Sequence, residues 1–213
     1  MPTPGINRRP TVFVVDDDES TRELFRWLLS TNGIPVEVFR CAQDFLLAVR
    51  VDQPGCVVLD LRMPDMSGLE LQKHLAQRGV DVPIVFVTGE GNVSQAVAAV
   101  KAGAVDFVEK PFDYNRILSL IRECLARSAE QRRRVSERQG VACRLASLTP
   151  REREVLERVM AGKPNRVIAE DLVISVKTVE VHRSHIMEKL EVKSVAELVQ
   201  VALLGHFGAE GSA

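Results

Sequence analysis

The sequence has few cysteines and few aromatic residues, and this scarcity excludes several classes of protein. Only four of the 213 residues are cysteine, 5% are aromatic, and there is one tryptophan and one tyrosine. The cysteines are Cys41, Cys56, Cys124 and Cys143. They are far apart and show no paired spacing, which argues against a disulfide framework or a cysteine-rich metal site and favours a reducing compartment.

Long apolar runs are also absent. No segment approaches the roughly 18 apolar residues that span a bilayer, and the opening MPTPGINRRP has no apolar stretch typical of a signal peptide. We therefore expect a cytoplasmic protein with no membrane partner. Hydrophobic residues make up 46% of the chain and charged residues 27%, a balance typical of one large or two modest globular domains.

The chain has no excess of charge of one sign, because its net charge is -1. Residues 1–127 hold 14 basic and 17 acidic side chains, residues 128–148 hold 5 and 2, and residues 149–213 hold 9 and 10. The positive charge is thus concentrated in the middle. Without a strongly basic tail, any nucleic-acid-binding function must be argued from local pattern.

The first 112 residues alternate short β-rich runs with amphipathic stretches. The β-rich runs cover 11–15, 34–39, 55–60, 83–88 and 104–110. Helical patterns cover about 20–32, 42–50, 67–78 and 92–102, and a fifth begins near Asp113. This alternation predicts an α/β fold with a doubly wound, five-stranded parallel sheet covered on both faces.

Capping residues mark several of the expected helix boundaries. Ser20 with Glu23, and Ser67 with Glu70, fit the capping-box pattern. The fifth helix meets no proline, and no glycine before Gly140, so we expect it to run beyond the sheet domain and to break there. The next residues, VACRLAS, are then expected to form a linker.

The remainder of the chain, from residue 149, predicts a small all-α unit. Thr149, Pro150 and Glu152 form the start of a helix with a capping box. Four helices are expected at about 150–161, which Gly162 ends, and at 165–172, 176–190 and 195–204. Ser175 is expected to cap the third of these helices, and Ser194 with Glu197 the fourth.

Polar side chains follow the β-rich runs at the points where they end. They are Asp16 and Asp17 after the first run, Asp60 after the third, Thr88 at the end of the fourth and Lys110 after the fifth. Because parallel strands end at one edge of a sheet, these side chains should converge. Three carboxylates predict a Mg²⁺ site, and Thr88 with Lys110 suits the oxygens of a phosphoryl group.

Four motifs over residues 10–127 resemble the receiver domain of two-component response regulators: VVDDDE, VVLDLRMPDMSGLEL, VFVTGEG and KAGAVDFVEKPF. The resemblance implies that Asp60 is phosphorylated by a sensor histidine kinase. It also implies that Asp16, Asp17, Asp60 and the backbone carbonyl of Arg62 hold Mg²⁺. Thr88 and Lys110 would contact the phosphoryl oxygens, and the Lys110-Pro111 bond would be cis. Asp18 is not expected to bind the metal and is assigned only to the loop before the first helix.

The same resemblance implies a switch. Thr88 would move toward the phosphoryl group and make room for Phe107, which changes a surface that forms the active homodimer. Val97 and Lys101 lie one helical turn apart and are expected on that surface. Arg62 and Glu90 have opposite charges and are expected to pair at the mouth of the site and to influence phosphoryl lifetime.

Residues 165–190 predict a helix, a short turn and a second helix. A helical projection of 176–190 leaves Lys177, Glu180, Val181, Ser184 and Glu188 opposite the apolar stripe. Contacts to DNA phosphates are expected from Lys177, Thr178, Arg183 and His185, and base contacts from Glu180, Val181 and Ser184. His182 is expected nearer the core. An ordinary helical hairpin remains the alternative.

The segments LTPREREVLERVMAG, IAEDLVISVKTVEVHRSHIMEKL and SVAELVQVA are similar to the LuxR-type DNA-binding domain. A receiver domain followed by this unit resembles the NarL/FixJ family, and FixJ-like members most closely. The resemblance implies a receiver domain at 1–127, a helical linker at 128–146 and a helix-turn-helix domain at 147–213. It implies a phosphorylation-dependent regulator that binds promoter DNA, with RNA polymerase as a further candidate partner, and that catalyses only its own phosphorylation and dephosphorylation.

Two other functions remain open at this stage. One is a DNA-binding regulator that needs no phosphorylation. The other is a phosphatase of the haloacid dehalogenase type, which also uses aspartate and Mg²⁺ but requires a DxDx motif after the first strand. The long fifth helix is expected to separate the domains or to contribute to a dimer, and its basic run, Arg132 to Arg134, also fits a solvated helix face.

Overall fold

A computed structural model of the chain describes residues 9–50, 53–89 and 93–205. The chain divides into two compact units, Met1–Arg132 and Arg133–Ala213. Within the described part, no helix is both long and apolar enough to cross a membrane.

The first unit contains one sheet of five strands. These are β1 (Thr11–Val15), β2 (Val36–Phe39), β3 (Gly55–Leu59), β4 (Ile84–Thr88) and β5 (Asp106–Glu109). All pairs are parallel, in the order β2-β1-β3-β4-β5. Strands β3 and β4 are buried along their whole length, as their uninterrupted apolar runs require. The predicted doubly wound parallel sheet is confirmed.

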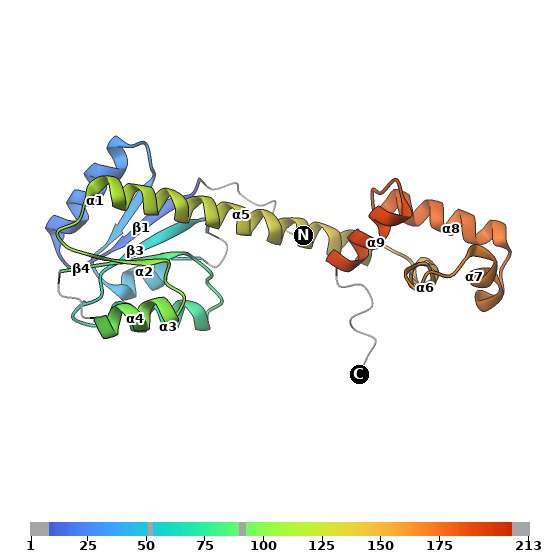
Figure 1. Ribbon diagram of the computed structural model, residues 1–213, viewed down its shortest axis with the longest axis horizontal. Coiled ribbons are helices and arrows are strands. Elements are labelled where there is room, and N and C mark those ends of the chain that lie inside the picture. Colours follow the sequence, from blue (N-terminus) through green and yellow to red (C-terminus); the bar gives the residue numbers. More distant parts are fainter. Residues whose placement is uncertain (1–8, 51–52, 90–92, 206–213) are drawn as a thin grey trace. The chain divides into compact units, whose positions relative to one another are not determined.

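Helices cover both faces of this sheet (Figure 1). They are α1 (Glu19–Thr31), α2 (Ala42–Ala48), α3 (Gly68–Gln77), α4 (Val93–Lys101) and α5 (Tyr114–Ala146). The first and last of these, α1 and α5, enclose one apolar core with Phe25 and Ile121, and α2, α3 and α4 enclose another with Phe45 and Leu71. The carboxyl ends of the strands therefore remain as an edge where polar side chains gather.

The start of α1 differs from the prediction. Asp18, not Ser20, is the N-cap residue, and its carboxylate accepts hydrogen bonds from the Ser20 amide at 3.1 Å and the Thr21 hydroxyl at 2.8 Å. The predicted box of Ser20 with Glu23 is wrong, because a carboxylate two residues earlier already satisfies these donors and Glu23 pairs with Arg26. The box at the start of α3, Ser67 with Glu70, is confirmed.

Helix α5 continues through Gly140, so the predicted break and the 141–147 linker are wrong. Gly140 costs only about 1 kcal/mol relative to alanine in a helix. Two residues beyond it, Val141 and Leu145, are 5% exposed and pack in the core of the second unit. Their burial outweighs the cost of the glycine, and the helix ends at Ala146.

The described part of the second unit consists of helices joined by short turns. After the end of α5 it contains α6 (Pro150–Met160), α7 (Asn165–Leu172), α8 (Val176–Lys189) and α9 (Val195–Leu204). Thr149 with Glu152 forms the expected capping box, and Ser175 and Ser194 cap α8 and α9. The Glu197 carboxylate accepts from the Lys193 amide, whereas the sequence predicted that it would bond Ser194.

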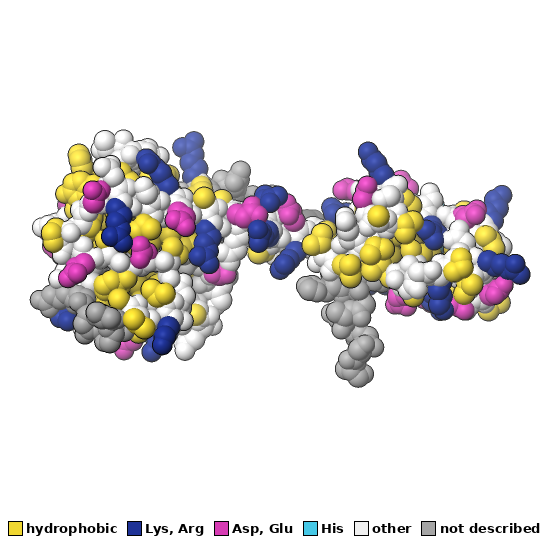
Figure 2. All heavy atoms as spheres, viewed as in Figure 1, with side chains coloured by type: hydrophobic (Ala, Val, Ile, Leu, Met, Phe, Trp, Pro, Cys, Tyr) yellow, Lys and Arg dark blue, Asp and Glu magenta, His cyan; other side chains and the backbone are white. Residues whose placement is uncertain are grey.

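The surface of both units mixes charges of both signs. Figure 2 shows Lys and Arg side chains interspersed with Asp and Glu on the face in view. This agrees with a net charge of -1. A general attraction to DNA is therefore weak, and any DNA contact depends on a particular helix face.

Candidate functional site

The carboxyl edge of the sheet brings together four of the predicted site residues. Asp16 follows β1, Asp60 follows β3, Thr88 ends β4 and Lys110 follows β5. The side chains of the first three are almost fully buried, since Asp16 is 2%, Asp60 7% and Thr88 1% exposed. The Lys110-Pro111 bond is cis, as the sequence motif implied.

Lys110 connects the two buried carboxylates. Its Nζ donates to Asp16 Oδ2 at 2.8 Å and lies 3.7 Å from Asp60 Oδ1. It also donates to the Thr21 hydroxyl at 3.0 Å. One ammonium group thus offsets two carboxylates and is held in place by a third element, the first turn of α1.

Backbone amides fix the orientation of both carboxylates. The Asp18 amide donates to Asp16 Oδ1 at 2.9 Å, and the Arg62 amide donates to Asp60 Oδ2 at 2.7 Å. In each case the donor lies two residues after the aspartate, where the chain turns away from the sheet. Asp17 is exposed beside them. The Arg62 amide therefore fixes the direction of the Asp60 carboxylate oxygens.

The electrostatics of the site leave an excess of negative charge. Burial, together with the neighbouring charge of Asp16, raises the pKa of Asp60 to about 6. Burial also raises the pKa of Asp16, although the hydrogen bond from Lys110 opposes the increase. A buried carboxylate that ionises this reluctantly is stabilised by additional positive charge.

The side chains of the site offer the type of ligand atom that a hard divalent cation binds. Within the described ranges, no three acidic, histidine or cysteine side chains are arranged around a metal position. The single ammonium of Lys110 lies beside both Asp16 and Asp60 and offsets only part of their charge. The available donors are nevertheless carboxylate oxygens, which Mg²⁺ prefers. The unmet negative charge at Asp60 agrees with such an occupant.

The residues predicted to form the switch and the dimer surface lie on β5 and α4. Phe107 is half-buried on β5, with its ring centroid 6.5 Å from that of Phe86. On α4, Val97 is 46% exposed and Lys101 is also exposed. Glu90, the expected partner of Arg62, lies outside the described residues.

Most of the predicted DNA-binding residues lie on one face of α8. Val179 and Ile186 point into the core, and the opposite side exposes Lys177, Glu180, Val181, Ser184 and His185. Thr178 and Arg183 are half-buried. Arg183 donates to Asn165 Oδ1 at 2.8 Å, which ties it to the start of α7, and the Thr178 hydroxyl bonds that of Ser175 at 2.7 Å.

Sequence reasoning missed two residues of the acidic site. Thr21 accepts from Lys110, and Arg22 Nη1 donates to the backbone carbonyls of Asp16 and Asp17 at 2.8 Å each. Both lie in the first turn of α1, next to the acidic loop. Their position directly after Asp18 could have indicated this role, because residues in the first turn of a capped helix lie close to the loop that precedes the helix.

This combination of fold and site defines a class. A parallel sheet in the order 2-1-3-4-5, with buried aspartates, a threonine and a lysine at its carboxyl edge, is that of a receiver domain. Comparison with known families agrees. Residues 12–122 match the response regulator receiver domain, and residues 146–202 match the bacterial regulatory proteins of the luxR family.

Individual relatives extend over nearly the whole chain. It is 43% identical to the transcriptional regulatory protein FixJ of Rhizobium meliloti, over 93% of this chain and 97% of the relative. It is 47% identical to FixJ of Azorhizobium caulinodans, over 91% and 92%. Among solved structures, the response regulator StyR aligns with a TM-score of 0.86 and 45% identity, over 92% of this chain and 99% of that one.

Full-length FixJ from B. japonicum aligns with a TM-score of 0.56 and 38% identity, over 93% of this chain and 98% of that one. The chain belongs to the NarL/FixJ family of response regulators, in which a receiver domain precedes a LuxR-type DNA-binding domain. It is thus a phosphorylation-dependent transcriptional regulator of a two-component system.

Proposed function

We propose that a sensor histidine kinase phosphorylates Asp60, and that the phosphorylated chain forms a homodimer and binds promoter DNA through α8. The observation that supports this most directly is the buried Asp60 carboxylate. It is oriented by the Arg62 amide and lies 3.7 Å from the Lys110 ammonium. The gathering of two buried carboxylates and a lysine at the carboxyl edge of the sheet supports this role.

The reaction is a phosphoryl transfer to a carboxylate. An Asp60 oxygen attacks the phosphorus of a phosphohistidine, a P–O bond forms, the P–N bond breaks and the imidazole leaves. Lys110 and Thr88 stabilise the charge on the phosphoryl oxygens. Asp16, Asp17, Asp60 and the Arg62 carbonyl would hold Mg²⁺, which when bound adds positive charge at these oxygens. The chain thereby catalyses only its own phosphorylation and dephosphorylation.

DNA recognition is assigned to the exposed face of α8. Lys177, Thr178, Arg183 and His185 are proposed to contact phosphates, and Glu180, Val181 and Ser184 to contact base edges. The exposure of Lys177, Glu180, Val181 and Ser184 on one side of a helix whose other side is buried supports this assignment. RNA polymerase is a further candidate partner of the promoter-bound form.

Labelling with acetyl phosphate tests the proposal. With Mg²⁺ present, the wild-type chain should become phosphorylated and should then bind selected DNA more tightly, whereas Asp60→Ala should show neither change. Asp65→Ala is a matched control, because Asp65 is an exposed acid in the same loop and should leave both responses intact.

Two results would favour the other functions. DNA binding of equal strength with and without phosphorylation, and in Asp60→Ala, would indicate a regulator that does not need phosphorylation. Sustained turnover of a phosphate ester would indicate a phosphatase. The second outcome requires a nucleophilic aspartate followed two residues later by an acid, and here Asp16 and Asp18 occupy those positions, with the Asp18 carboxylate engaged as the cap of α1.

A further inference from the structure

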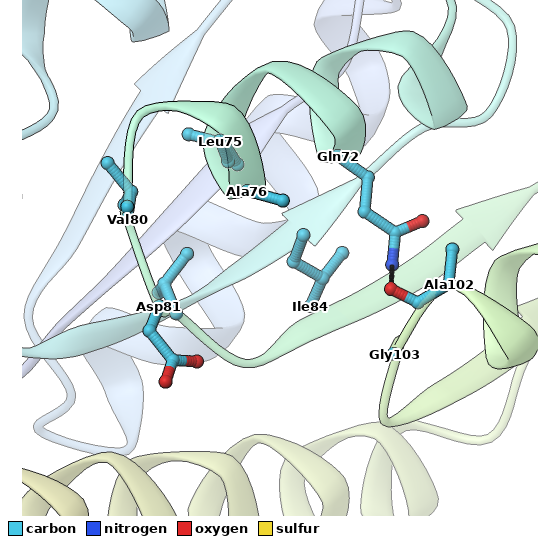
Figure 3. A pocket seen from close by; sticks show the side chains of 10 residues that line it. Gln72, Leu75, Ala76, Val80, Asp81, Ile84, Ala102 and Gly103 are labelled. Atoms are coloured by element: carbon cyan, nitrogen blue, oxygen red, sulfur yellow. Dashed lines mark hydrogen bonds between the residues drawn. The ribbon is translucent and has the colours of Figure 1, made fainter. Parts of the chain in front are cut away.

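A buried glutamine joins two helices of the receiver domain. Gln72 lies on α3 and is only 5% exposed. Its Nε2 donates to the Ala102 carbonyl at 3.1 Å (Figure 3). It also lies 3.4 Å from the Ala99 carbonyl, and both acceptors are at the C-terminal end of α4. The side chain therefore crosses from one helix and caps the end of the next.

The surroundings of Gln72 show that this link is not ordinary core packing. Its Oε1 is buried and accepts no hydrogen bond from any of the residues that the structure describes. A cavity of about 310 Å³ lies beside it, lined by Leu75, Ala76 and Ile84 among others. Figure 3 shows the amide reaching toward Ala102 along one side of this space. The amide thus links α3 to this end of α4 in addition to the apolar contact that Leu71, Leu75 and Ala99 make in the shared core.

The other end of α3 lies against the phosphorylation site. Gly68, the first residue of α3, donates its amide to the Leu61 carbonyl at 3.0 Å. A Cβ atom at Gly68 would lie 2.3 Å from the backbone oxygen of Asp60. The helix therefore begins in direct contact with the backbone of the phosphoacceptor, one turn before Gln72.

The far side of α4 is the proposed dimer surface. Ala99 is fully buried toward α3, whereas Val97 and Val100 are 46% and 52% exposed. Lys101, next to the residues that accept from Gln72, is exposed as well. Because a helix moves as a unit over one or two turns, displacement of its tied end also displaces these side chains.

We infer that Gln72 is a positioning residue that ties α4 to α3, so that a rearrangement at Asp60 reaches the exposed face of α4. The route runs from Asp60 through Gly68 and Gln72 to Ala99 and Ala102. It differs from the path through Thr88 and Phe107 in that it runs along α3, although the Phe86 ring lies near both Gly68 and Phe107. The inference rests on the proposed function, in which Asp60 is phosphorylated and α4 contributes to the dimer.

Gln72→Met tests it, because methionine has nearly the same shape but cannot donate. The dimerisation constant is measured by sedimentation with and without acetyl phosphate and Mg²⁺, and the rate of Asp60 labelling is measured in parallel. We expect the ratio of the two dimerisation constants to fall about fivefold or more, within the usual range of coupling between sites. The labelling rate should stay at the wild-type value.

Ser128→Ala is the matched control. The buried Ser128 hydroxyl of α5 accepts from the Gly55 amide at 3.2 Å, so this change also removes a buried bond between two elements. It should lower stability without changing the dimerisation ratio. An equal fall in the two variants, or none in Gln72→Met while the wild type responds, would overturn the inference and leave the proposed function intact.

Two further results separate the remaining cases. If the wild type itself shows no phosphorylation-dependent dimer, the proposed function fails. If Gln72→Met does not fold, amide hydrogen exchange of the wild type at residues 99–103 decides. A change in protection on phosphorylation supports the tie, and unchanged protection contradicts it.

Discussion

Glu152 does for the second unit what Asp16 does for the first: it is a buried carboxylate held by a lysine from a distant part of the chain. It is 4% exposed, accepts from Lys189 Nζ at 2.7 Å and accepts from the Thr149 amide at 2.8 Å. Burial alone would raise the pKa of Glu152, but the hydrogen bonds from Lys189 and Thr149 outweigh burial and lower it. The cap of α6 and the end of α8 are thereby joined.

Glu152→Gln should lower the free energy of unfolding by about 1–3 kcal/mol at pH 7, because Lys189 then donates to a neutral amide oxygen in place of a carboxylate. Since the folded pKa lies below the ordinary value, this stability is present above about pH 4.5 and is lost as pH falls through the lowered pKa. Urea unfolding of both proteins between pH 3 and 7 measures the effect. The difference should shrink in acid, and the exposed Glu188→Gln should show none.

The sequence alone placed Asp16, Asp60, Thr88 and Lys110 together, because parallel strands end at one edge whatever the details of packing. It did not find Thr21, nor Asp18 as the cap of α1. At the start of α1, three neighbouring side chains can each accept a hydrogen bond from the backbone amides of the first turn. Which side chain does so depends on its torsion angles, which the sequence pattern does not encode. The fold of the first unit was predicted correctly, whereas the residues around the acidic loop were not, because several local hydrogen bonds compete there.

At the scale of elements, α5 shows how packing decides where a helix ends. Gly140 is the kind of residue that stops an isolated helix, yet Val141 and Leu145 beyond it are buried in the second unit. The absence of proline, and of glycine before Gly140, predicted that the helix extends into the basic run. The position of its end followed from contacts distant in sequence, which no local pattern contains.

Gly140→Ala should therefore raise the free energy of unfolding by about 0.5–1 kcal/mol, since alanine loses less backbone entropy in a helix. A Cβ atom there meets nothing within 4 Å. Ala142→Gly, at an exposed position in the same helix, should cost about as much. Thermal unfolding of the three proteins provides the measurement. A loss of stability in Gly140→Ala would mean that the helix breaks at residue 140 after all.

At the scale of the whole molecule, two units of different architecture share one chain and one long helix. The sequence predicted both architectures, because short continuous apolar runs alternating with amphipathic stretches in the first part, and a helical period of three to four residues in the second, are strong signals. The order of events between them follows from the proposed function. Phosphorylation in the first unit should alter self-association before it alters DNA binding by the second.

Val97→Asp should uncouple these events. The side chain is 46% exposed on α4, so aspartate should be tolerated in the monomer but should place two like charges at a symmetric contact. Labelling of Asp60 should be normal, whereas the phosphorylated dimer should weaken at least about tenfold, a cost of about 1.4 kcal/mol. Leu47→Asp on α2, where the side chain is 87% exposed, is the control. A phosphorylated Val97→Asp dimer of normal strength would move the interface elsewhere.

The contact between Gly68 and the Asp60 carbonyl also bears on how this protein tolerates mutation. A side chain at position 68 would meet the Asp60 oxygen, the Phe86 ring at 2.8 Å and Leu59 at 3.1 Å. Steric clash thus excludes a side chain at position 68. Substitution of the neighbouring Asp60 is excluded for a chemical reason, since its carboxylate is the proposed phosphoacceptor. In a saturation library selected for signalling, loss at Gly68 and loss at Asp60 would look alike. Only a parallel selection for folding would separate them, since Asp60 variants should survive it and Gly68 variants should not.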